Sequence, residues 1–146
     1  MISQALLYAT EAAKSSKVHG PKHWRSVTAL GAQLCLETPG SDPHVVDLFA
    51  ALHDTQRLND GHDPLHGRRA AGLATRLHAE GVITATEEQM QVLIPALAAH
   101  TDGFVSDDPT VGCCWDADRL DLPRCGIQPN PELLSTIAAR RMLAEA

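Results

Sequence analysis

The chain has 146 residues and a formal net charge of −6. This length supports one hydrophobic core, so we expect a single domain over residues 1–146. The excess of acidic residues disfavours a protein that binds nucleic-acid polymers by neutralising their phosphates. We expect neither a membrane partner nor an export signal, and therefore a cytoplasmic protein.

Apolar residues recur with helical spacing almost throughout, which predicts an all-α bundle of about six or seven helices. The first helix is expected at about residues 2–16. A second begins at Pro21, which suits the first turn of a helix. Asp42, just before Pro43, is in the position of an N-cap for a third helix that ends at His53.

The remaining helices follow polar turns and are expected at about residues 64–80, 86–101, 109–122 and 130–146. The last of them is predicted to place Leu133, Leu134, Ile137 and Ala138 on its core face. Trp24 and Trp115 are predicted to be packing residues.

The pair His53-Asp54 ends the third predicted helix and precedes the polar segment TQRLNDGHDP. His23 lies upstream and Asp118 downstream, so the chain contains an ordered H…HD…D set. Ligands that converge from separate helices are how a bundle builds a metal site. Imidazole and carboxylate groups without thiolate favour a borderline or hard divalent ion, with Mn, Fe, Mg, Ni, Co and Zn all conceivable. Two His and two Asp leave coordination positions open, as catalytic metal sites do.

These four residues, in this order, resemble the HD-domain superfamily of metal-dependent phosphohydrolases. DADRLD (116–121) is similar to the stretch that carries the family's last metal-binding aspartate, and HGPKHWRSV (19–27) to the opening metal-histidine helix of small single-domain members. The resemblance covers about residues 17–125. It implies a helical domain that holds one ion, or two, between its helices and hydrolyses a nucleotide or other small phosphoester with a metal-activated water.

The resemblance implies that His23, His53, Asp54 and Asp118 bind the metal. Asp54 is also expected to orient or deprotonate the attacking water. Asp116 and Asp121 are expected to cap helices or to form ion pairs instead, because helical spacing turns them away from the face of Asp118.

Two further histidines follow the family's order. His66 and His100 are expected to complete a second metal site or to act on the substrate phosphate, the alternative being hydrogen-bonded histidines at helix ends. A phosphate also needs cations, and arginine binds phosphate in a bidentate manner. The candidates near the motifs are Arg57, Arg68, Arg69 and Lys22.

Two other functions stay open. The six residues His23, His53, Asp54, His66, His100 and Asp118 could hold two irons, as in oxygen-activating relatives of this family. Alternatively, the ion is structural and the chain is a regulatory binding module. Arg57-Leu58 stands where the branch that hydrolyses guanosine tetraphosphate has Glu-Asp, which disfavours that activity. Substrate, metal identity and oligomeric state are not predicted.

Overall fold

The computed structural model describes residues 20–59 and 61–146, so the helix predicted at about residues 2–16 lies outside the described residues. Every regular element in the described part is helical, which confirms the all-α prediction. The α-helices are α2 (Pro21–Glu37), α3 (Pro43–Leu52), α4 (His66–Ala79), α5 (Glu87–Ala99), α6 (Pro109–Leu120) and α7 (Ile137–Glu145). Two short 3₁₀ helices, η1 (Leu122–Cys125) and η2 (Pro131–Leu133), follow α6. Within these ranges, no helix has the length and apolar character needed to cross a bilayer.

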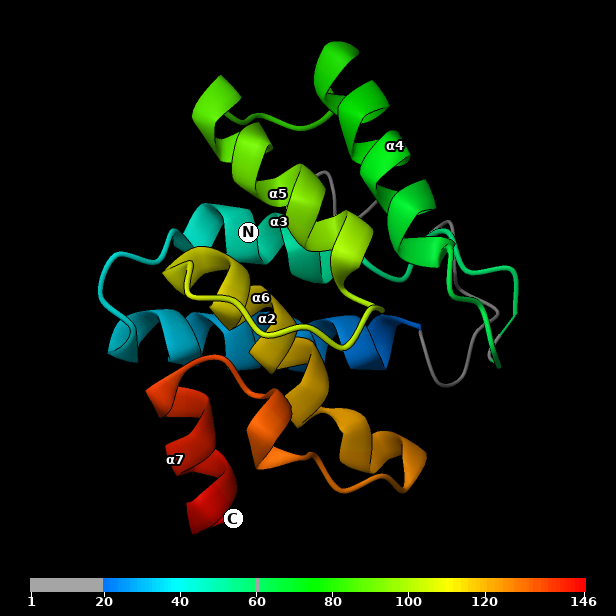
Figure 1. Cartoon of the computed structure of the whole chain (residues 1–146). Coiled ribbons are helices and arrows are strands. Elements are labelled where there is room, and N and C mark those ends of the chain that lie inside the picture. The colour runs from blue at the N-terminus through cyan, green and yellow to red at the C-terminus, as the bar shows by residue number, and fades with distance from the viewer. Residues whose placement is uncertain (1–19, 60) are drawn as a thin grey trace.

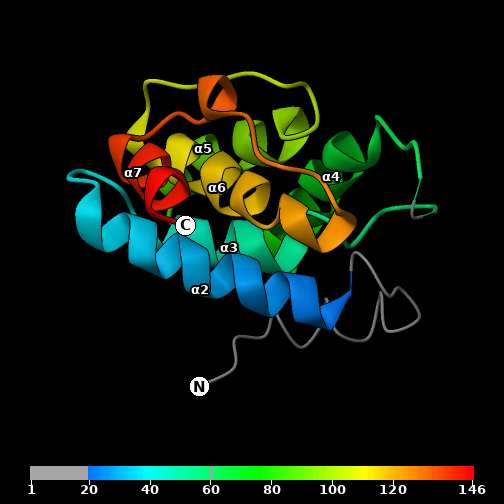
Figure 2. The same cartoon turned by 90° about the horizontal axis from the view of Figure 1, so that it is seen from below.

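Three helices, α2, α3 and α6, contact one another at the centre of the molecule. The α4–α5 pair packs on one side of this centre and α7 on the other (Figure 1). Figure 2 shows α2 running along one edge of the central group. The core consists of the apolar faces of these helices, with fully buried side chains such as those of Trp24, Val27, Phe49, Leu52, Leu93, Leu97 and Cys113.

Polar side chains at the helix starts explain where several helices begin. The Asp42 carboxylate accepts the backbone N–H of His44, as predicted for an N-cap of α3. Thr86 and Gln89 form a reciprocal capping box at the start of α5. Asp108 accepts two backbone N–H groups at the start of α6. These local contacts place the helix ends, and the helix ends carry the candidate site.

The C-terminal segment departs from the prediction of one helix over about residues 130–146. The Asp116 side chain is fully buried, and its two carboxylate oxygens accept the backbone N–H groups of Ser135 and Thr136, each at 2.7 Å. These bonds hold the chain extended after η2. Thr136 then caps α7 by accepting the N–H of Ala139, so the helix begins only at Ile137. Asp116 was predicted to cap a helix or to form an ion pair, whereas these bonds go to the backbone that precedes α7, and Thr136 provides the cap.

This interruption changes which residues of the segment face the core. Leu134 and Ala138 are buried, as predicted. The prediction was wrong for Leu133 and Ile137, whose exposed fractions are 40% and 69%. The physical reason is the extended stretch between η2 and α7. Because the helix is not continuous, residues before and after this stretch do not share the one helix face that the sequence pattern assumed.

Candidate metal centre

Five elements bring their ends together at one place in the molecule. His23 lies in the first turn of α2, His53 directly follows α3, His66 begins α4, His100 directly follows α5, and Asp118 lies in the last turn of α6. Figure 1 shows the start of α2, the end of α3, the start of α4 and the end of α5 on the same side of the bundle. The predicted ligands therefore converge, although they are far apart in sequence.

The first cluster consists of His23, His53, Asp54 and Asp118. The Nε2 atoms of His23 and His53 lie 2.9 Å apart. Asp118 Oδ1 lies 3.1 Å from His23 Nε2 and 3.3 Å from His53 Nε2. Asp54 Oδ2 lies 3.3 and 3.6 Å from the same two nitrogens. All four ligand atoms thus face one small volume.

The second cluster consists of Asp54, His66 and His100. Asp54 Oδ1 lies 3.0 Å from His66 Nε2 and 3.8 Å from His100 Nε2. The two histidine nitrogens lie 2.9 Å apart. Because Oδ2 faces the first cluster and Oδ1 faces the second, Asp54 is shared between them. Both groups, His23–His53–Asp54 and Asp54–His66–His100, are buried and could each hold a metal ion.

Hydrogen bonds orient all four histidines in the same way. His53 Nδ1 lies 3.0 Å from the Ala50 carbonyl oxygen, His66 Nδ1 lies 2.6 Å from that of Asp63, and His100 Nδ1 lies 2.7 Å from that of Leu97. His23 Nδ1 lies 2.7 Å from Asp121 Oδ2. Carbonyl oxygens and carboxylates only accept hydrogen bonds, so each Nδ1 carries the hydrogen and donates it. In the neutral imidazole, each Nε2 then presents a lone pair to its cluster, as metal-binding histidines do.

The first cluster also shifts the pKa values of its members. Burial alone would lower the pKa of His23, but the carboxylates of Asp118 and Asp54 outweigh it and raise this pKa to about 10. Burial alone would raise the pKa of Asp118, but His53 and His23 hold it well below its usual range. The metal-free cluster therefore carries a positive charge on imidazole beside ionised carboxylate. A divalent cation would replace that charge.

Arg57 is the only predicted substrate-binding cation in contact with a cluster. Its Nη1 lies 3.2 Å from His66 Nε2 and 4.0 Å from Asp54 Oδ1. Its other guanidinium nitrogens donate to the carbonyl oxygens of Asn59 and Gly61. The loop after α3 thus holds this positive charge beside the second cluster.

The other three predicted cations lie outside the clusters. Arg69 donates to the carboxylate of Asp63 and to the carbonyl oxygen of Gln56, so its guanidinium braces the loop before α4. Arg68 is exposed, with Nη2 3.9 Å from Asp102 Oδ2. Lys22 is exposed near the start of α2. Their role in substrate binding stays a prediction.

Asp63 supports the centre, although sequence reasoning did not single it out. Its backbone carbonyl orients His66, and its carboxylate accepts the Leu58 N–H at 2.7 Å. The hydrogen bond from the Leu58 N–H and the charge of Arg69 hold the pKa of Asp63 below its usual value, although burial opposes them. The sequence signal was weak, because an aspartate in a polar loop is usually solvated. Asp121 pairs with His23, in agreement with the predicted ion-pairing role.

Gly67 permits the close approach of α4 and α5 that forms the second cluster. A Cβ atom at this position would lie 2.5 Å from the Leu97 carbonyl oxygen and 3.0 Å from His100 Nδ1. We therefore expect Gly67→Ala to push α4 away from α5 and to lower the unfolding free energy by about 1–3 kcal/mol. Urea unfolding measures the stability, and metal analysis should show a lower metal content if the second cluster holds an ion.

Gly72→Ala on the same helix is the matched control. Position 72 is exposed, and an added Cβ there would meet no atom within 4 Å. Helix propensity alone should make this variant more stable, by up to about 1 kcal/mol. Two Gly→Ala changes of equal effect would contradict the steric explanation.

No protein-family model, curated protein or solved structure matches this chain. The case for a metal centre therefore comes from the geometry of the chain itself.

Proposed function

We propose that this chain is a metal-dependent phosphohydrolase of the HD type that acts on a small phosphoester. The observation that carries this proposal is the sharing of Asp54, whose two oxygens face two separate groups of buried histidines. Carboxylate and imidazole ligands suit Mn, Fe, Co, Ni or Zn, and Mg less well because of the histidines. A bound divalent ion lowers the pKa of a coordinated water and offsets negative charge on the reacting phosphate.

The residues of the chain provide the other requirements of phosphate hydrolysis. Asp54, His66 and His100 lie together, so groups that accept and donate protons stand next to the first cluster. When only the first cluster holds an ion, Asp54 Oδ1 can accept a proton from the attacking water. His66 or His100 can then protonate the leaving group. Arg57 supplies a fixed positive charge for a phosphate oxygen.

The test begins with protein that is purified without added metal. Elemental analysis should find one or two divalent ions per chain. The metal-loaded protein is then assayed for release of phosphate from a panel of sugar phosphates, nucleoside monophosphates and short carboxylate-bearing phosphomonoesters. Metal-dependent release supports the proposal. A protein that is fully loaded with each candidate metal and releases no phosphate from the panel contradicts it.

A di-iron oxygenase is the second candidate, because six ligand side chains converge on two adjacent groups. Two irons per chain with substrate-dependent oxygen uptake would favour this function over hydrolysis. If the ion were only structural, chelation would unfold the chain, whereas a catalytic ion should leave the helical circular-dichroism signal in place when removed. The same purified protein serves all three measurements.

A further inference from the structure

A small pocket opens beside the two metal clusters. Its volume is about 220 Å³, and its wall includes His100 from the second cluster and Asp118 from the first. A pocket for a drug-sized ligand measures about 300–1,000 Å³. This pocket therefore suits a small chemical group that is attached to whatever the clusters bind.

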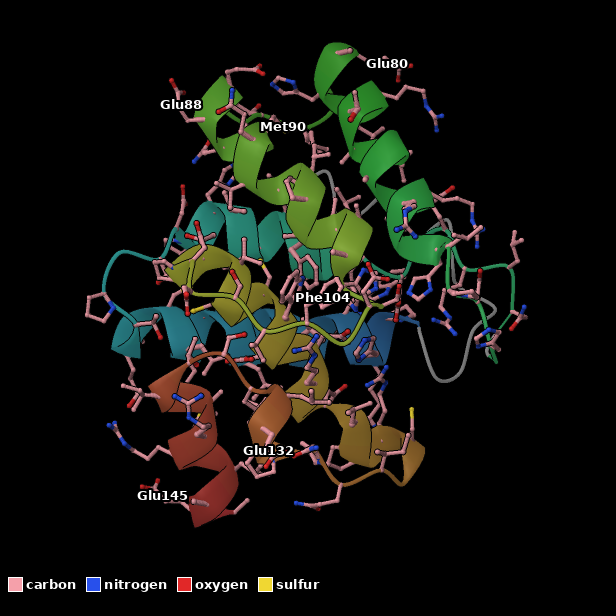
Figure 3. The ribbon with its side chains drawn as sticks, viewed as in Figure 1. Glu80, Glu88, Met90, Phe104, Glu132 and Glu145 are labelled. Atoms are coloured by element: carbon pink, nitrogen blue, oxygen red, sulfur yellow. The ribbon has the colours of Figure 1, made fainter. Side chains whose placement is uncertain are left out.

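The rest of the wall combines polar and apolar side chains. Leu122 and Leu133 are apolar, whereas Thr101 and Arg119 are polar. The connection between α5 and α6 forms one edge, and Figure 3 shows Phe104 on this connection, where its side chain is 59% exposed. A short carbon chain with a polar end would match both kinds of surface.

Arg119 is the charged residue of this wall that the proposed reaction does not use. Its Nη1 donates to the Leu133 carbonyl oxygen, and its guanidinium carbon lies 5.5 Å from the centre of the Trp115 ring. Its Nη2 is shut off from solvent, and no described residue accepts a hydrogen bond from it. A buried polar atom without a partner calls for an explanation, and a ligand that draws the guanidinium into the pocket would give Nη2 a partner.

The nearby carboxylates are already engaged elsewhere. Asp116 accepts the backbone N–H groups of Ser135 and Thr136. Asp118 faces the two histidines of the first cluster. Burial lowers the pKa of the Arg119 guanidinium, although Asp116 and Asp118 oppose this effect. A guanidinium stays charged in proteins, so a positive charge with unused hydrogen-bonding capacity lies in the pocket wall.

We propose that this pocket receives the end of the substrate away from the reacting phosphate, and that Arg119 selects there for a second anionic group, a carboxylate. The inference rests on the proposed function, because it takes the clusters as the position of the phosphate. Arg57 and Arg119 then contact opposite ends of the substrate. Arg57 lies beside the second cluster and serves the phosphate, whereas Arg119 follows the ligand Asp118 and serves the other end. The substrate class is a short phosphomonoester with a terminal carboxylate.

Non-hydrolysable phosphonates test this selection without requiring turnover. The full chain, loaded with Mn²⁺, is titrated calorimetrically with phosphonoacetate and 3-phosphonopropionate. The matched uncharged compounds are ethylphosphonate and propylphosphonate. We expect at least one carboxylate compound to bind about tenfold more tightly than its alkyl partner. Equal affinities within both pairs, or no binding of any of the four, would overturn the inference.

Arg119→Met should abolish this preference and leave the affinity for the alkyl compounds unchanged. Arg76→Met, at an exposed position on α4, is the matched control and should keep the preference. Because Arg119 also donates to Leu133, Arg119→Lys is a second variant that keeps the charge but loses the planar fork, and it should retain part of the preference. A folded Arg119→Met protein that keeps the full preference contradicts the role of Arg119.

The two proposals fail in different ways. A carboxylate preference without phosphate release from any substrate would contradict hydrolysis and leave the pocket assignment standing. Phosphate release without a carboxylate preference would contradict the pocket assignment alone.

Discussion

Asp54→Ala is expected to abolish metal binding by both clusters, whether one ion or two is bound, and to lower phosphate release by at least about a thousandfold, since it removes a shared ligand and a proton acceptor together. Each Asp54 oxygen lies within 4 Å of two histidine nitrogens, one pair in each cluster. An ion in either cluster would therefore depend on this one side chain. Elemental analysis and a phosphate assay with the best substrate of the panel measure the two effects.

Two further variants make this result specific. Asp107→Ala removes an exposed aspartate from the connection between α5 and α6 and should change neither metal content nor rate. His66→Ala removes a ligand of the second cluster only, so one ion should remain. An Asp54→Ala protein that still binds two ions would show that the clusters are not linked through this carboxylate.

The affinity for metal is expected to rise as the pH is raised from about 6.5 towards 10. Each proton that the metal displaces contributes about a tenfold rise in affinity per pH unit. The cause is the pKa of His23, which is raised to about 10 in the metal-free fold. Over this range His23 is protonated, so an ion must displace its proton. Calorimetric titration in buffers with different heats of ionisation measures the number of protons released.

The same pKa predicts how the metal-free protein responds to pH. A histidine whose pKa is raised on folding stabilises the fold fully below its ordinary value of 6.5, and this contribution is lost as the pH rises through about 10. The metal-free chain should therefore become less stable between pH 6.5 and 10, and bound metal should offset this loss. Thermal unfolding with and without metal measures both.

His44 provides the control for the pH dependence. Its side chain is exposed and hydrogen-bonds the Thr84 carbonyl oxygen, away from the clusters. His44→Gln should leave the pH dependence of the metal affinity unchanged. His23→Gln should lower the metal affinity and make it less dependent on pH. A flat dependence in the unmodified chain would mean that His23 carries no proton when the metal arrives.

Local sequence patterns determined the helices and the kinds of ligand. Apolar residues at helical spacing predicted the elements, and the N-cap at Asp42 followed from one polar side chain next to a proline. His53 and His100 directly follow helices, where a ring nitrogen reaches the last free carbonyl oxygens of the same helix. These features depend on neighbours three or four residues away, which is why a sequence can reveal them.

Only the tertiary structure decided how the ligands are shared and oriented. His23 and Asp121 are 98 residues apart, and their contact exists because α2 packs against α6. The division of the two Asp54 oxygens between two clusters depends on the approach of α4 to α5 at Gly67. Asp116 likewise interrupts the predicted last helix, because its carboxylate accepts the backbone N–H groups of Ser135 and Thr136, which lie 19 and 20 residues further along the chain. Such contacts are set by helix packing and side-chain direction, and the spacing of residues in a sequence records neither.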